Sequence, residues 1–258
     1  MESRALFEEV VECLKENKPA ALATVTGVTG STPARVGAKM LVYADGTTLG
    51  TIGGGKLEAE VIKAAGQAIN NMEPFFSDYS LNADDAGMVC GGGASVFIEP
   101  LLPASQLLIA GAGHVSQYVA RLGKMLGFEV AVVDDRPEFA NKEFFPEADR
   151  LIVNDIGQAL AEYKITVNTY IVIVTRGHQY DESALERVVN SNAAYIGMIG
   201  SKNKVKTIFD NLRRKGIKDA SLDKVYAPIG LKLGGKKPPE IAVSILAEIL
   251  QVRYGKKE

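Results

Sequence analysis

The stretch that decides the fold is LLIAGAGHVSQYVARLGKMLGFEVAVVDDRP, residues 107–137. Its pattern predicts a buried strand, a tight turn at Gly111 and Gly113, a helix, and a second strand that ends at Asp134. Strand, glycine turn and helix in this order are typical of dinucleotide-binding domains, where amide groups at the helix N-terminus receive a phosphate. We therefore predict a nucleotide or pyrophosphate site at these glycines. The alternative is a glycine turn that serves packing alone.

An acidic residue follows this turn at the spacing of a ribose-binding site. Asp134 comes 23 residues after Gly111, at the end of the second strand. In dinucleotide-binding domains an acid near this position accepts hydrogen bonds from the ribose of the nucleotide. The acid favours a ribose whose 2′-hydroxyl is free. Ser116 replaces the third glycine of the usual fingerprint, which predicts a helix slightly further from its strand.

From residue 106 onward, apolar β-branched segments alternate with helical ones. Such alternation predicts a parallel sheet covered by helices on both faces. The expected fold class is therefore α/β, with a Rossmann-like doubly wound domain at residues 106–258 and a strand order of 3-2-1-4-5. Residues 1–100 predict a smaller α+β domain with a hairpin at Asp45-Gly46, and residues 101–105 predict a linker.

Both histidines of the chain follow strands of the predicted sheet. His114 follows the first strand of the domain and His178 follows the fourth, and in the expected order these strands flank the point where ligands bind. We expect both at this ligand-binding mouth, with Arg176 as an anion partner and His178 as the candidate catalytic acid or base. A capping or hydrogen-bonding role for each histidine is the alternative. No third ligand accompanies them, so the sequence predicts no zinc site.

Glycine-rich segments recur in the first hundred residues. The segment Gly53–Gly55 ends a predicted strand and begins a predicted helix, so its amide groups and the helix dipole could receive an anion. The alternative is a simple tight connection between the two elements. In another, Cys90 directly precedes three glycines, either as a turn residue or as a presented thiol. The other cysteine, Cys13, has the spacing of a core residue on a helix. The candidate binding residues of these segments are Arg35, Gly53, Gly54, Gly55, Lys56, Gly91 and Gly92.

The composition excludes several classes of protein. With 47% hydrophobic and 23% charged residues over 258 positions, the chain has the composition of a folded globular protein. Residues 101–258 carry 22 Lys and Arg against 18 Asp and Glu, a bias that suits a phosphate-bearing ligand and is too weak to indicate nucleic acid. No apolar run is long enough to cross a bilayer, and the two cysteines form no disulfide framework. We therefore expect a cytoplasmic protein that binds no membrane.

A series of segments, in order and with natural spacing, resembles one known family. The segments are GSTPARVGAKMLV at 30–42, GTIGGGKLEAEV at 50–61, MVCGGGASVFIEP at 88–100, LLIAGAGHVSQYVA at 107–120, VVDDRPEFAN at 132–141, YIGMIGSKNKV at 195–205 and APIGLKLGGKKPPEIAVSILAEI at 227–249. The series is similar to the xanthine dehydrogenase accessory protein family, also called XdhC/CoxI. The resemblance implies a small N-terminal XdhC/CoxI domain, a C-terminal Rossmann-like domain, and a role in maturing molybdenum hydroxylases.

The resemblance also implies a mode of action. Members of this family are understood to bind molybdenum cofactor, which is of the molybdopterin type, to protect it while its terminal sulfur is installed, and to pass it to the apo-enzyme. This implies a cofactor chaperone rather than a catalyst, with a xanthine dehydrogenase-type apo-enzyme, a cysteine desulfurase and a second copy of the chain as partners. One alternative is an NAD(H)-dependent oxidoreductase that binds NAD or another nucleotide in its Rossmann-like domain. Another is a protein that serves only as a docking module.

Finally, the resemblance gives Cys90 a role. Many relatives have cysteine at the position of Lys56, so Cys90 becomes the candidate sulfur ligand or sulfur relay and the candidate molybdenum contact. Relatives commonly carry arginine after this CGG segment, where this chain has Gly93. Arg35 or Lys56 could supply the ligand anchor that this difference removes.

Overall fold

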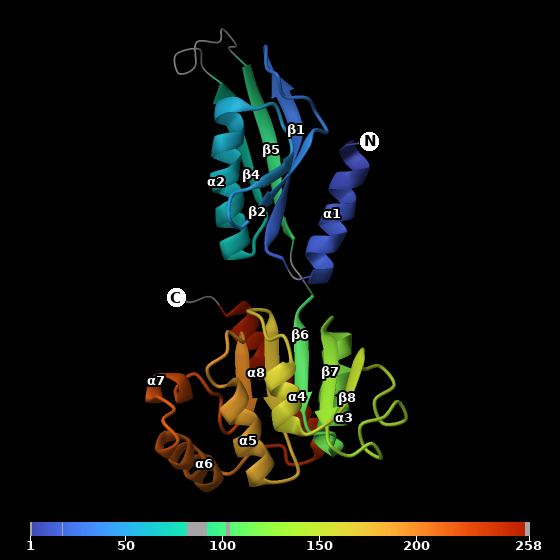
Figure 1. Cartoon of the computed structure of the whole chain (residues 1–258), viewed down its shortest axis with the longest axis vertical. Helices are drawn as coiled ribbons and strands as arrows, with labels where there is room; N and C mark the ends of the chain where they lie inside the picture. The colour runs from blue at the N-terminus through green and yellow to red at the C-terminus, as the bar shows by residue number, and fades with distance from the viewer. Residues whose placement is uncertain (1, 17, 82–91, 102–103, 256–258) are drawn as a thin grey trace. The chain divides into compact units, whose positions relative to one another are not determined.

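The computed structural model describes residues 2–16, 18–81, 92–101 and 104–255. The chain divides into two compact units, Met1–Pro103 and Ala104–Glu258 (Figure 1). Each unit has hydrophobic clusters of its own, so each has the interior that an independently folding domain needs.

The N-terminal unit is a five-stranded antiparallel sheet of order β3-β2-β1-β5-β4 with helices packed on both faces (Figure 1). Along β1, alternate residues point to opposite faces. Ala21 and Ala23 pack in the cluster formed with α2, whereas Leu22 packs in the cluster formed with Leu6 and Cys13 of α1. The elements are α1 (Glu2–Glu16), β1 (Ala20–Thr29), β2 (Lys39–Tyr43), β3 (Thr48–Gly50), α2 (Gly55–Asn71), β4 (Phe75–Leu81) and β5 (Gly92–Leu101).

Two sequence predictions for this unit are confirmed. β2 and β3 form a hairpin that pairs Met40 with Gly50, and in its turn Asp45 accepts a hydrogen bond from the Thr47 amide at 2.9 Å. Cys13 is fully buried in the core, and burial raises the pKa of its thiol. The thiol of Cys13 is therefore neither accessible nor activated.

The C-terminal unit is a five-stranded parallel sheet of order β10-β9-β6-β7-β8. With β6 counted as the first strand, this order is 3-2-1-4-5 from β8 to β10, which confirms the predicted doubly wound arrangement. The elements are β6 (Gln106–Ala110), α3 (His114–Met125), β7 (Glu129–Asp134), β8 (Arg150–Val153), α4 (Ile156–Glu162), β9 (Thr169–Ile173), α5 (His178–Val188), β10 (Tyr195–Met198), α6 (Lys202–Arg214), α7 (Asp219–Leu222) and α8 (Pro238–Tyr254).

Helices cover both faces of this sheet because its strands are apolar on both sides (Figure 1). Leu107 and Ile109 of β6 pack in a cluster with α3 and α8, and Leu108 and Ala110 of the same strand pack in a cluster with α4, α5 and α6. Every residue of β9 is buried. Because β6 is parallel to its neighbours β7 and β9, the carboxyl ends of these three strands share one edge of the sheet. Open α/β sheets bind ligands at this edge.

Candidate functional site

The turn after β6 is held between the two strands that flank it. The Gly111 amide donates to the Val133 carbonyl at 2.8 Å, and the Val174 amide donates to the Ala110 carbonyl at 2.9 Å. Gly111 has a φ of +108°, and a Cβ at this position would lie 2.5 Å from the Val174 carbonyl oxygen. Only glycine meets both requirements. The turn therefore depends on the neighbouring strand β9 as well as on its own sequence.

The helix that follows the turn is open at its N-terminus. Gly113 is the N-cap of α3 in an extended conformation, with no side-chain capping hydrogen bond. A Cβ at Gly113 would meet nothing within 4 Å. The amide groups of the first helical turn and the positive end of the helix dipole thus face open space, as an anion-binding helix terminus requires.

A pocket of about 260 Å³ lies at this helix terminus, and we call it the switch-point pocket. It brings together three of the predicted site residues, Gly113, His114 and Arg176. The sequence prediction missed Gln117, Arg136, Phe139, Phe144, Val174 and Thr175, which also line it. The run DDRPEFANKEFF after β7 was the available signal for Arg136 and the two phenylalanines, because it places charged and aromatic residues directly after a strand that ends at the ligand edge.

Asp134, the predicted ribose-binding acid, is buried beneath Arg136. Its Oδ2 accepts hydrogen bonds from the Ala112 amide at 2.7 Å and from Arg136 Nη2 at 3.0 Å. Its Oδ1 accepts from Arg136 Nε at 2.8 Å and from the Arg136 amide at 3.1 Å. Burial on its own would raise the pKa of Asp134, but these hydrogen bonds outweigh it and hold the pKa below its ordinary value. The carboxylate is thus charged and fully engaged.

Two arginines flank the pocket, each held by an aspartate and an aromatic ring. The Arg136 guanidinium lies over the Phe139 ring at 4.1 Å, and its hydrogen bonds to Asp134 raise the pKa of Arg136. Arg176 Nη2 donates to Asp135 Oδ2 at 2.7 Å, and its guanidinium lies over the Tyr180 ring at 4.1 Å. Rings and carboxylates fix the orientation of both guanidinium groups. The arginine side chains therefore lose less conformational entropy when an anion binds.

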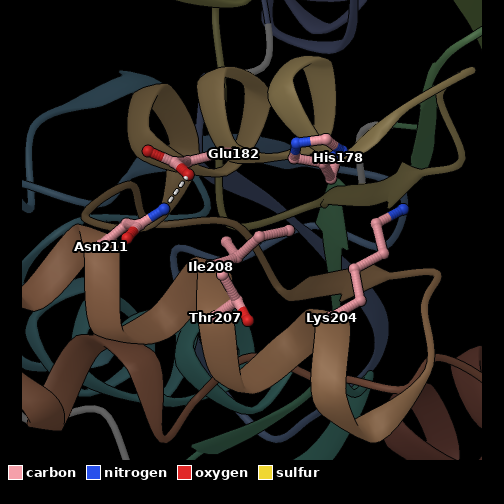
Figure 2. Close-up of a pocket in the computed structure, with 6 residues that line it drawn as sticks. All are labelled: His178, Glu182, Lys204, Thr207, Ile208 and Asn211. Atoms are coloured by element: carbon pink, nitrogen blue, oxygen red, sulfur yellow. Dashed lines mark hydrogen bonds between the residues drawn. The ribbon is translucent and has the colours of Figure 1, made fainter.

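His178 lies in a different pocket from His114. Figure 2 shows His178 and Glu182 on α5 facing Lys204, Thr207, Ile208 and Asn211 on α6. This α5–α6 pocket has a volume of about 370 Å³. Asn211 donates to Glu182 across it at 2.8 Å. The two histidines begin helices that follow neighbouring strands, yet the structure does not bring them together around one pocket.

A buried carboxylate connects the two pockets. Asp181 is fully buried, and its Oδ1 accepts hydrogen bonds from the Thr175 amide at 3.1 Å and from Thr175 Oγ1 at 2.6 Å. Its Oδ2 pairs with the Lys204 ammonium group. The N-cap of α5 is Gly177, and Asp181 lies in the first turn of the helix. Thr175 lines the switch-point pocket and Lys204 lines the α5–α6 pocket, so Asp181 holds one residue of each.

In the N-terminal unit, a carboxylate of the protein itself accepts a hydrogen bond from one of the predicted anion-binding residues, Gly54. Glu58 Oε1 accepts hydrogen bonds from the Ile52 amide at 3.0 Å and the Gly54 amide at 2.9 Å, and also from Thr51 Oγ1. Burial opposes the charged form of Glu58, but these bonds prevail and lower its pKa. The glycine turn before α2 is therefore already supplied with an anion.

The other predicted residues of this unit have varied surroundings. A Cβ at Gly53 would lie 2.9 Å from the Ala34 amide nitrogen, and a Cβ at Gly92 would collide with the Ser31 carbonyl oxygen, so close backbone packing accounts for both glycines. A Cβ at Gly54 or at Gly55 would meet nothing within 4 Å. Arg35 and Lys56 are exposed. Cys90 and Gly91 lie outside the described residues.

Metal binding and membrane spanning find no support in the described part of the chain. Within it, no group of three or more His, Cys, Asp and Glu residues could hold a metal ion. None of the helices described is both long and apolar enough to cross a membrane.

The fold and the pocket define a Rossmann-like domain that follows a small α+β domain. Comparison with known families gives the same division: residues 107–249 match the XdhC Rossmann domain, and residues 13–80 match the XdhC and CoxI family. The chain belongs to the XdhC and CoxI family, which confirms the resemblance and the fold class predicted from the sequence.

The chain is similar to three curated bacterial proteins. It is 37% identical over 252 residues to the protein of Escherichia coli K12 called uncharacterized protein YqeB, covering 96% of this chain and 46% of YqeB. It is 34% identical over 159 residues to a probable xanthine dehydrogenase subunit of Bacillus subtilis, covering 62% of this chain and 46% of that protein. It is 23% identical over 289 residues to the molybdenum cofactor insertion chaperone PaoD of E. coli, covering 99% of this chain and 90% of PaoD. The chain thus spans less than half the length of the first two relatives.

A solved structure shares the fold. A protein from Bacillus halodurans described as a xanthine dehydrogenase superposes with a TM-score of 0.54 and 24% sequence identity, covering 100% of this chain and 97% of that one.

Proposed function

We propose that this protein is a maturation factor that binds molybdenum cofactor, supports its sulfuration and delivers it to a xanthine dehydrogenase-type hydroxylase. The observation that carries the proposal is the family match in both units, together with a relative named a molybdenum cofactor insertion chaperone that aligns with 99% of this chain. The proposed partners are the apo-hydroxylase, a cysteine desulfurase and a second copy of this chain, all in the cytoplasm.

The switch-point pocket fits one end of such a cofactor. A molybdopterin-type cofactor carries a planar pterin and a phosphate, and when bound it supplies the molybdenum centre that the hydroxylase needs for its redox chemistry. In this chain the amide groups at the start of α3, with Arg136 and Arg176, would hold the phosphate. Phe139 and Phe144 offer flat apolar faces to a ring system.

The sulfur-binding end of the proposal rests on Cys90. Molybdenum in these cofactors is a soft centre for which a thiolate is a suitable ligand. Cys13 is buried with a raised pKa, so it does not meet the requirements of a sulfur ligand or relay. Cys90, the other cysteine of the chain, is therefore the proposed thiol.

A second candidate function is an NAD(H)-dependent oxidoreductase. The glycine turn and open helix terminus favour it, as does the cluster of His178, Glu182 and Lys204 in the α5–α6 pocket, which contains groups able to exchange protons. In this alternative the Rossmann-like unit binds NAD or another nucleotide in the switch-point pocket and His178 acts as acid or base.

One purification distinguishes the two functions. The full chain is isolated without air from cells that make molybdenum cofactor, then analysed for molybdenum and by mass spectrometry for pterin. A maturation factor retains a molybdenum–pterin species in near-stoichiometric amount and does not turn over NADH. Recovery of the protein without pterin contradicts the first proposal, and NADH oxidation with an acceptor supports the second.

A matched pair of arginine variants tests the location of the cofactor. Arg176→Ala removes a guanidinium of the switch-point pocket, and we expect cofactor retention to fall by about tenfold through loss of charge-assisted hydrogen bonds. Arg121→Ala removes an exposed arginine of α3 that pairs with Glu147, so retention should match the wild type. Equal retention by both variants would place the cofactor elsewhere.

A further inference from the structure

The side chain that the switch-point pocket presents at its ribose position is a guanidinium instead of a carboxylate. By spacing, Asp134 is the acid that a dinucleotide-binding domain directs at ribose hydroxyls. In the structure its side chain is 2% exposed, and Arg136 lies between it and the solvent-facing wall with its side chain 24% exposed. A ligand in this pocket therefore meets Arg136.

Competition for Asp134 disfavours a ribose hydroxyl there. Both carboxylate oxygens already accept hydrogen bonds. Two of these hydrogen bonds come from the charged guanidinium of Arg136. A hydroxyl would have to displace a charge-assisted bond inside a buried pair and replace it with a weaker neutral one. The expectation of a free 2′-hydroxyl at Asp134 thus loses its chemical basis in the folded chain.

Arg136 still has donors for a ligand. Its bonds to Asp134 use Nε and Nη2, and no partner of Nη1 is found among the described residues. The Phe139 ring lies 4.1 Å from the guanidinium and stacks on Phe144, at 6.4 Å between ring centroids and 22° between planes. Arg136 is held rigidly, with a nitrogen available beside an aromatic wall.

A phosphate is the group that suits this arrangement. Guanidinium groups bind phosphate oxygens with strong, directional hydrogen bonds. In dinucleotide-binding domains, an arginine near the end of the second strand accommodates a phosphate on the ribose. The pairs Asp134–Arg136 and Asp135–Arg176 are each neutral as a whole, so an incoming anion meets no unpaired carboxylate at this wall.

We propose that the switch-point pocket selects ligands that carry a phosphomonoester next to a planar heterocycle, with Arg136 as the specificity-determining residue. Two sources share this chemistry: a nucleotide phosphorylated on its ribose, and a pterin that bears a terminal phosphate. The assignment does not depend on the maturation role, since it concerns which ligand binds and is measured without a hydroxylase.

Calorimetric titration of the full chain with two matched pairs of probes tests whether the switch-point pocket selects a phosphomonoester. The first pair is adenosine 2′,5′-bisphosphate against adenosine 5′-diphosphate, which have the same number of phosphates but place one of them differently. The second pair is neopterin monophosphate against neopterin. We expect the phosphomonoester member of at least one pair to bind about tenfold or more tightly than its mate. The pair that discriminates identifies the source.

A variant assigns the selectivity to Arg136. Arg136→Gln should bring the affinities within the discriminating pair close together, whereas Arg121→Gln, on the exposed surface of α3, should leave the ratio unchanged. The wild-type titrations decide the question even if Arg136→Gln folds poorly. The proposal is overturned if the phosphomonoester member binds more tightly in neither pair, or if no probe binds, whatever the cofactor analysis gives for the maturation role.

Discussion

Two aspartate–arginine pairs organise the switch-point pocket at the scale of single residues. Asp134 holds Arg136 and Asp135 holds Arg176. The pairs differ in exposure, because the side chain of Asp134 is 2% exposed and that of Asp135 is 30% exposed. Removing one partner of a buried pair leaves a desolvated charge, whereas an exposed partner recovers its hydration from water. Asp134 is therefore expected to contribute more to stability than Asp135 does.

The pH dependence of an Asp134→Asn variant tests this role. Near neutral pH we expect the free energy of unfolding to fall by about 2 kcal/mol, because the hydrogen bonds from Arg136 and the Ala112 amide lose their charge assistance. The pKa of Asp134 is lowered from 3.8 in the folded chain, so the stability it contributes is present above that value and is lost as the pH falls through the folded-state pKa.

Urea unfolding measured over a range of pH provides the readout. Wild type and Asp134→Asn should differ near neutrality and converge in acid. Asp223→Asn, which changes an exposed aspartate, is the control and should follow the wild type throughout. A difference that stays constant with pH would show that the carboxylate's charge is not what stabilises this turn.

The proposed thiol is also tested at the scale of one residue. Cys90→Ala should give a protein with the circular dichroism and melting temperature of the wild type that fails to deliver active cofactor to the apo-hydroxylase. The readout is hydroxylase activity after incubation with cofactor-loaded accessory protein, with Cys13→Ser as a comparison that should lower stability through its buried site. If Cys90→Ala activates the enzyme as well as wild type does, the residue has only a turn role.

At the scale of elements, both units use a glycine turn to begin a helix, with different outcomes. The N-caps Gly113 of α3 and Gly54 of α2 are alike in that neither has a side-chain cap and a Cβ at either would meet nothing within 4 Å. The two turns differ in that Glu58, from the first turn of α2, accepts hydrogen bonds from the Ile52 and Gly54 amides just before its own helix. Residues three and four positions into a helix can reach back to its free amides, which is the geometry of capping by a carboxylate. Glu58 thus already occupies amides of the turn before α2, whereas the turn before α3 borders the switch-point pocket.

A pair of alanine substitutions separates the structural and binding roles of the open turn. Gly111→Ala combines a φ of +108° with a Cβ 2.5 Å from the Val174 carbonyl oxygen, so we expect a loss of about 2–4 kcal/mol in the free energy of unfolding. Gly113→Ala has a negative φ and open space around its Cβ, so its stability should remain within about 1 kcal/mol of wild type.

Thermal or urea unfolding of these two variants gives the stabilities, and calorimetric titration gives the effect on binding. Gly113→Ala adds a methyl group to the mouth of the switch-point pocket, so it should weaken binding of the phosphomonoester probes while the fold persists. Equal stability of the two variants would contradict the close contact between the turn and β9.

At the scale of the whole molecule, each unit has its own sheet and its own hydrophobic clusters. The parallel sheet of Ala104–Glu258 is covered on both faces by helices of the same unit. We expect a fragment of residues 104–258 to fold alone, to unfold cooperatively in urea, and to bind the phosphomonoester probes with the affinity of the full chain. A fragment with no cooperative transition would show that the N-terminal unit is needed for its stability.

The periodicity of the sequence was sufficient to predict much of the architecture. Alternating apolar strands and helices from residue 106 onward predicted the doubly wound sheet and its strand order, because a parallel sheet buried on both faces needs continuous apolar strands. The Asp45-Gly46 hairpin and the burial of Cys13 could also be predicted from the sequence, since both follow from spacing within one segment. The glycine turn at Gly111 and the start of the helix at His114 were likewise predictable from local sequence.

The side-chain environments depended on the tertiary structure. Spacing placed Asp134 at the ribose position, but its burial under Arg136 depends on how the loop after β7 folds back on the turn after β6. Asp181 pairs with Lys204 of α6, 23 residues away in the sequence, only because the fold brings α6 against α5. The sequence by itself determined the family, the sheet and the edge of the sheet at which we propose a ligand site, because these follow from local periodicity and motif order. Only the tertiary structure decided which charged groups line the switch-point pocket, because pairs such as Asp135–Arg176 join elements that lie far apart in the sequence.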